Sequence, residues 1–197
     1  GGPGQVAALA AILALAGLVR GFTGFGTGLV FMPLATTMID PAVGILVMAV
    51  TGVVVWPVLL PGAWAAADRR DVGVLAAGAV LSAPVGVAAL GLLPVETIRW
   101  LVAVAATITL AALVFGWRYR GPVRAPGLVA LGGAAGLIGG TTGLPAPPVI
   151  LFYMATARAA EAVRANTILF LAAIDVTIIS NLVIQGRVGA PALALAA

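Results

Sequence analysis

Apolar residues follow one another along most of this chain in runs that are too long for the elements of a soluble protein. Charged residues and prolines divide the sequence into apolar stretches, which lie at 5–38, 43–60, 72–93, 97–117, 126–156, 165–185 and from 189 onward. About 20 apolar residues are enough for a helix to cross the hydrocarbon core of a bilayer. The pattern therefore predicts an all-α, polytopic membrane protein.

Two of these stretches, 5–38 and 126–156, are much longer than one crossing requires. Each is interrupted by a run rich in glycine and threonine, at 21–28 and at 136–143. Glycine is unfavourable inside a helix, and the prolines just downstream lack a backbone N–H donor. We therefore expect each long stretch to contain a Gly-broken helix or a re-entrant hairpin.

The two glycine-rich runs are copies of one another. A shift of 115 residues aligns Gly17 with Gly132, Gly21 with Gly136, Gly24 with Gly139, Thr27 with Thr142, Gly28 with Gly143, Leu29 with Leu144 and Pro33 with Pro148. Self-similarity at a fixed spacing indicates internal duplication, so we interpret residues 1–123 and 124–197 as two homologous transmembrane repeats. The second repeat is shorter than the first, and we expect its last helix or two to be missing at the C-terminal end.

The arginines between the stretches bear on the topology. If each broken element turns back, residues 69, 70, 118, 120, 124, 158 and 164 place seven arginines on one side against two on the other. If each broken element crosses, the division is six against three. Positive charge is enriched in cytoplasmic loops. The larger imbalance therefore favours elements that turn back, which give inverted repeats, over elements that cross, which give parallel repeats.

The amino-acid composition excludes several classes of function. The chain is 62% hydrophobic and 8% charged, against about 25% charged residues in a soluble domain, so its exterior faces lipid. It has no His and no Cys, which removes imidazole bases, thiol nucleophiles and the usual zinc ligands. We expect no enzyme, no cofactor, no metal and no nucleic-acid partner. Whether the chain forms a homo-oligomer is left open.

Two helix breaks at equivalent positions predict a binding site for a small anion. A break inside a membrane exposes N–H groups at the positive end of a helix dipole, and paired breaks mark substrate sites in transporters. The residues expected to contact the anion are Gly24, Gly26, Thr27, Gly28, Gly139, Gly140, Thr141, Thr142 and Gly143. The alternative is a scaffold without transport, in which glycines at small-xxx-small spacing serve helix packing.

Charged and amide side chains near the breaks are further candidates. Arg20 precedes the first break, and Arg164 and Asn166 open the helix after the second. An arginine there can hold an anion through its planar donor fork, or can extend to the membrane interface. Asp175 lies in the middle of the 165–185 stretch, where an ionised carboxylate is costly. It is a candidate for ion coupling, or a buried polar partner of a neighbour such as Asn181.

The two motifs resemble those of a known family. The first reads Gly21-Phe-Thr-Gly-Phe-Gly-Thr-Gly-Leu-Val-Phe-Met-Pro33, and the second reads Gly139-Gly-Thr-Thr-Gly-Leu-Pro-Ala-Pro-Pro-Val-Ile-Leu151, followed by Arg164-Ala-Asn166. They are similar to the motifs of the sulfite exporter TauE/SafE family, also described as the toluene-sulfonate uptake permease family, except that Ala146 stands where one branch has Gly. The resemblance implies a permease with two homologous halves in a bacterial-type inner membrane, for sulfite, a sulfonate or another small organic anion. The chain has no Walker-type ATP-binding motif, so we expect a secondary carrier.

Overall fold

The fold is built from α-helices. The computed structural model describes residues 3–23, 26–116, 125–154 and 159–186, and every element within them is helical. The helices are α1 (Pro3–Thr23), α2 (Thr27–Ala35), α3 (Pro41–Ala66), α4 (Arg69–Leu92), α5 (Val95–Val114), α6 (Ala125–Thr142), α7 (Ala146–Met154) and α8 (Ala160–Ile184). Six of them are long and apolar enough to cross a membrane. The predicted all-α, polytopic class is therefore confirmed, whereas the stretch predicted from residue 189 lies outside the described residues.

The two remaining helices, α2 and α7, are short. Each has nine residues, which is about 13 Å of helix and less than half of a hydrocarbon core. Helix α1 ends at Thr23 and α2 begins at Thr27, while α6 ends at Thr142 and α7 begins at Ala146. Helix α2 therefore starts inside the first glycine-rich run, whereas α7 starts just after the second.

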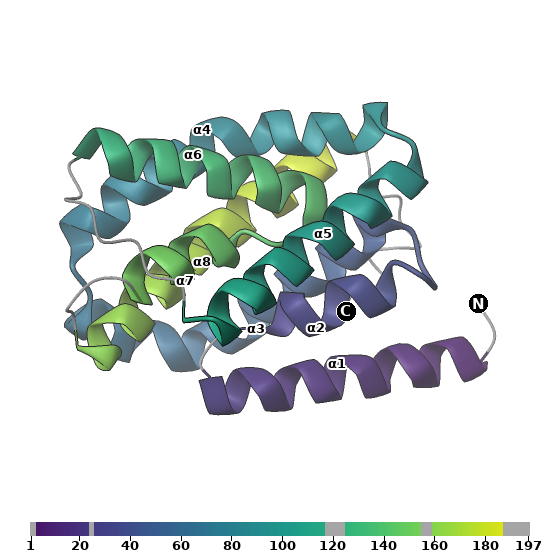
Figure 1. Ribbon diagram of the computed structural model, residues 1–197, viewed down its shortest axis with the longest axis horizontal. Coiled ribbons are helices and arrows are strands. Elements are labelled where there is room, and N and C mark those ends of the chain that lie inside the picture. Colours follow the sequence, from purple (N-terminus) through teal and green to yellow (C-terminus); the bar gives the residue numbers. More distant parts are fainter. Residues whose placement is uncertain (1–2, 24–25, 117–124, 155–158, 187–197) are drawn as a thin grey trace.

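Helix α8 runs through the middle of the bundle, in contact with α3, α4, α6 and α7 (Figure 1). Side chains fill the space around it, and Phe170, Ile174, Ile178 and Leu182 of α8 are almost completely buried. A helix that is apolar on all sides needs protein or lipid on all sides. The position of α8 places the single acid in its middle, Asp175, inside the protein.

Helices α4 and α6 lie side by side along most of their lengths (Figure 1). Glycines make this approach possible, because a Cβ atom added to Gly132 would overlap the carbonyl oxygen of Leu75, and one added to Gly136 would overlap that of Ala79. Between them, the Ser82 hydroxyl donates to the carbonyl oxygen of Gly133 at 2.7 Å. Small residues and an interhelical hydrogen bond are the usual means of holding membrane helices together.

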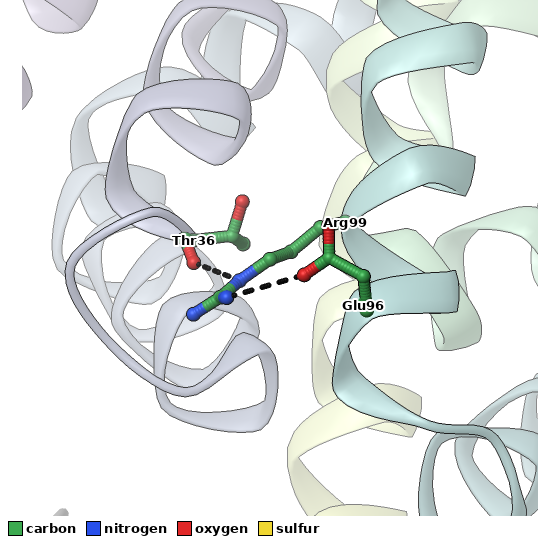
Figure 2. Close-up of polar contacts among 3 residues, drawn as sticks. All are labelled: Thr36, Glu96 and Arg99. Carbon is green, nitrogen blue, oxygen red and sulfur yellow. Dashed lines mark hydrogen bonds and ion pairs between the residues drawn. The ribbon is translucent and has the colours of Figure 1, made fainter.

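Arg99 of α5 holds the C-terminal end of the short helix α2 (Figure 2). Its Nε donates to the carbonyl oxygen of Thr36, the residue that caps α2, at 2.7 Å, and its Nη1 lies 3.5 Å from Glu96. A cation at this end satisfies an orphan carbonyl and opposes the negative end of the helix dipole. The contact fixes α2 at one end, so its N-terminal end is held in a defined place.

Helix α1 lies at the edge of the bundle and packs against α2 (Figure 1). Ala16 is the one fully buried side chain among its residues 4–21. Gly17 and Gly21 have open space where a Cβ atom would be, unlike Gly132 and Gly136 of α6. A polar contact adds to the packing, since the Gln5 side chain donates to the carbonyl oxygen of Met38 at 2.6 Å.

The contact between α4 and α6 makes a testable prediction with a matched control one residue away. Gly132→Ala should destabilise the protein by about 1–3 kcal/mol, because the added methyl group collides with the backbone of α4. Gly133→Ala on the same helix adds its methyl group to open space and should leave the stability unchanged or raise it by up to about 1 kcal/mol. Thermal unfolding in detergent measures both. Equal effects of the two substitutions would contradict this packing.

Candidate functional site

A small cavity opens where the two short helices begin. Its volume is about 60 Å³, and since about 10–15 Å³ is enough for one water molecule in this measure, it has room for a small anion or a few waters. It is lined by Arg20 of α1, by Gly26, Thr27, Gly28 and Leu29 at the start of α2, by Ile45, Met48 and Ala49 of α3, by Gly143, Leu144, Pro145, Ala146 and Pro147 at the start of α7, and by Leu171, Asp175 and Ile178 of α8.

The two glycine-rich motifs touch each other beside this cavity. A Cβ atom on Gly28 would lie 3.0 Å from the Leu144 side chain and 3.3 Å from the carbonyl oxygen of Gly143. Gly143 itself has a φ of +73°, and a Cβ atom there would lie 3.0 Å from both Ile45 and Met32. A side chain at either position would crowd its neighbours, and the second position also has a backbone conformation that disfavours one.

The N-terminus of α2 offers the cavity a full set of backbone donors. The first hydrogen bond of the helix runs from the Val30 N–H to the carbonyl oxygen of Gly26 at 3.3 Å. The four N–H groups that an α-helix leaves unbonded at its start therefore belong to Gly26, Thr27, Gly28 and Leu29. Together with the positive end of the dipole they favour an anion.

The N-terminus of α7 differs chemically. The four equivalent positions are Pro145, Ala146, Pro147 and Pro148, and because proline has no N–H, only Ala146 can donate. The Leu144 N–H just before them is directed to the Thr142 hydroxyl at 3.3 Å. The second motif therefore supplies an apolar proline wall and a dipole end, while the first supplies the donors.

Two opposite charges face this cavity without forming a bond to each other. Arg20 and Asp175 both line it and are near enough to interact electrostatically, yet no ion pair within 4 Å joins them, and neither side chain makes a hydrogen bond to the part of the chain that the structure describes. Burying a charge is costly when it has no partner. A ligand or water that bonds to these groups would relieve that cost.

The carboxyl group of Asp175 is seated against α3. A Cβ atom added to Gly52 would overlap its Oδ2 atom, so only glycine at this position of α3 leaves room for it. The Trp56 indole nitrogen lies 3.7 Å from that Cβ position, and it is buried without a hydrogen-bond partner among the residues that the structure describes. A buried N–H without an acceptor is rare, and here it lies beside a carboxyl group.

Of the other residues predicted from the second motif, Gly140 and Thr141 contact α4, whereas Gly139 and Thr142 make contacts within α6 and with the turn after it. A Cβ atom on Gly139 would lie 2.7 Å from that of Pro145, and one on Gly140 would lie 2.7 Å from the carbonyl oxygen of Ala83 in α4. The Thr141 hydroxyl donates to the carbonyl oxygens of Leu137 and Gly86, and that of Thr142 donates to Ile138. These four residues do not line the cavity. Gly24 lies outside the described residues.

Arg164 and Asn166 also lie away from the cavity. Arg164 is exposed in the first turns of α8. Asn166 is completely buried, and its Oδ1 accepts a hydrogen bond from the backbone N–H of Asp68 at 2.8 Å, which ties α8 to the start of α4. Asn181, the alternative partner of Asp175, instead donates to the carbonyl oxygen of Thr177.

Helix α3 contributes residues that sequence reasoning missed. Ile45, Met48 and Ala49 line the cavity, and Gly52 and Trp56 adjoin Asp175. They belong to the apolar stretch 43–60, which has no charged residue to mark them. The one available signal was the spacing of Gly52 and Trp56, four residues apart on one helix face.

Comparison with known proteins shows the family of this chain. The family described as Sulfite exporter TauE/SafE matches residues 9–197, nearly the whole chain. The chain belongs to this family. No curated protein and no solved structure matches it. As a TauE/SafE member with six apolar helices, it is a multi-pass membrane protein of a transporter family, for which a bacterial inner membrane is the fitting location. The scaffold alternative is not favoured.

The tight turn of this TauE/SafE chain at Gly143 can be tested against a glycine with the same backbone conformation. Gly143→Ala should destabilise the protein by about 2–4 kcal/mol, because it adds a steric cost to a backbone cost of about 1–2 kcal/mol. Gly116→Ala, at a φ of +63° with open space around it, should incur the backbone cost alone. Thermal unfolding in detergent measures the difference. If both substitutions cost the same, the contacts around Gly143 are loose.

Proposed function

We propose that this protein is a secondary carrier for a small anion, such as sulfite or a sulfonate, which binds in the cavity between α2, α3, α7 and α8. The observation that carries this proposal is the unpaired Arg20 facing the same cavity as the N-terminus of α2. A guanidinium group and free backbone N–H groups are donors that fit oxyanions. The family name adds support, because it describes a sulfite exporter.

We place the anion next to Gly26, Thr27 and Gly28, with Gly143 closing the opposite side. The absence of side chains at the glycines leaves the backbone accessible, and the donors of α2 outnumber that of α7. The apolar wall from α3 and α8 excludes water from one side of the cavity, which strengthens the attraction between Arg20 and an anion. Arg164 and Asn166 are not part of this proposed site, because they do not reach the cavity.

We also propose that the chain consists of two repeats, residues 1–123 and 124–197. Helices α1, α2 and α3 follow the same order of long, short and long as α6, α7 and α8. The matching Gly28 and Gly143 lie near the start of the short helix in each series, Gly28 in the first turn of α2 and Gly143 in the turn before α7. A site between two such helices is a common solution in secondary transporters, since each repeat contributes one half of it.

Within this carrier we assign the coupling role to Asp175. It is the one acid in the middle of a described membrane-spanning helix, and it shares the cavity with the proposed anion. An ionisable side chain at this depth is costly and is usually retained for function.

The proposal is tested by anion flux and binding in proteoliposomes, with sulfite, methanesulfonate and sulfate as probes. Arg20→Gln should weaken binding of the transported anion about 10-fold to 100-fold, because a charge-assisted hydrogen bond contributes about 1.5–3 kcal/mol. Arg164→Gln is the matched control and should bind like the unsubstituted protein. Normal binding by the Arg20 variant would remove this site from the mechanism.

A second substitution tests the cavity independently of charge. Gly28→Leu should abolish anion binding, because its side chain would fill the space beside Leu144 and Gly143. Circular dichroism and size-exclusion chromatography show whether the variant remains folded. Full affinity in a folded Gly28 variant would place the anion elsewhere.

A further inference from the structure

Resting on the proposed anion site, we propose that the anion and the Asp175 carboxylate compete for Arg20, so that an anion binds together with a proton on Asp175. The carrier then works as a proton–anion cotransporter. The proton and the anion then move in the same direction, with one proton for each monovalent anion.

With an anion bound, the cavity would contain one positive charge, that of Arg20, and up to two negative charges, those of the anion and Asp175. Among the residues that the structure describes, Arg20 is the only cation that lines it, and both Asp175 and an anion would be drawn to its guanidinium group. With the anion bound and Asp175 ionised, the site would carry an unbalanced negative charge in a region of low dielectric, which is strongly unfavourable. With the anion bound and Asp175 protonated, the charges of anion and arginine balance.

The charges of the empty site lead to the same conclusion. Without an anion, an ionised Asp175 balances Arg20, whereas a protonated Asp175 would leave a lone cation in the membrane interior. Both the empty and the loaded site are therefore neutral only if one proton enters with each monovalent anion. Neutral states are the ones that can reorient across a membrane without moving charge through it.

The position of the carboxyl group matches the neutral, loaded arrangement. Asp175 is seated in the gap that Gly52 leaves on α3, beside the indole nitrogen of Trp56, and no ion pair joins it to Arg20. Arg20 is left available to an anion. For Asp175 to pair with Arg20, its carboxyl group has to leave this gap and turn toward the guanidinium group.

Few other groups can produce this pH dependence. Helices α2, α3 and α6 carry no ionisable side chain, and the chain has no histidine. The remaining titratable or charged groups on the elements packed around Asp175 are Arg20 of α1, Arg69, Arg70 and Asp71 in the first turn of α4, Tyr153 of α7, and Glu161 and Arg164 at the start of α8. Of these, only Arg20 lines the cavity.

The test is binding of methanesulfonate to the full chain in nanodiscs between pH 5 and 8, because the charge of this probe is constant over that range. Below the pH at which Asp175 takes up its proton, affinity should be high and constant. Above it, affinity should fall by up to about tenfold per pH unit, since one proton must bind with each anion. Asp175→Asn should keep the high affinity at every pH, and Glu161→Gln on the same helix should retain the normal dependence.

Two further measurements keep the proposal falsifiable if the Asn variant does not fold. Calorimetry of the unsubstituted protein in buffers of different ionisation enthalpy should show uptake of up to one proton per anion above that pH. Gly52→Ala should displace the carboxyl group toward Arg20 and lower the affinity, whereas Gly62→Ala, in open space on the same helix, should not.

The outcomes separate this proposal from the one it rests on. Binding that is independent of pH, binding that strengthens as the pH rises, or an Asn variant with the normal pH dependence would overturn the competition and leave the anion site in place. No binding of methanesulfonate at any pH would overturn the site for this class of anion and the competition with it.

Discussion

Inside a bilayer a backbone N–H group has no water to bind, so a helix can begin there only where something else accepts its first hydrogen bonds. The starts of α2 and α7 meet that requirement in different ways. At α7, prolines occupy three of the four unbonded positions, and the Thr142 hydroxyl accepts from the residue before them. At α2 the described residues provide no such acceptor for the four N–H groups, which lie beside a cavity that is also lined by Arg20. An anion bound at the start of α2 would accept hydrogen bonds from these donors, and the proposed function rests on this.

The rest of the bundle holds these two helix starts in place. Arg99 binds the C-terminal end of α2, and the glycines of α6 allow its backbone to lie directly on α4, which positions the end of α6 from which the chain turns into α7. The second motif therefore contains both helix-packing and cavity-lining residues. Gly140 and Thr141 contact α4, whereas Gly143 makes the turn and lines the cavity.

Charge in the membrane interior is the second constraint. The described helices carry two charges at this cavity, Arg20 and Asp175, on helices that are far apart in the sequence. Their lack of a mutual ion pair distinguishes them from a structural salt bridge, which would be closed and satisfied. An arginine and an aspartate that share a cavity without pairing are free to exchange partners with a third charge, and this freedom is what a coupled carrier requires.

The sequence by itself determined the class of the fold, because the length and apolarity of its stretches leave few alternatives in a bilayer. Its two glycine-rich runs drew attention to the regions in which α2 and α7 begin. It also pointed to Asp175, since one acid in an apolar stretch is conspicuous. Only the tertiary structure decided which motif residues face the cavity: Thr141 and Thr142 bond to helix carbonyls, Arg164 is exposed, and Asn166 binds Asp68 instead. It alone brought Gly52 and Trp56 of α3 to Asp175. The physical reason is that an apolar stretch carries no periodic contrast between a protein-facing and a lipid-facing side, so its sequence cannot show which neighbour each residue meets.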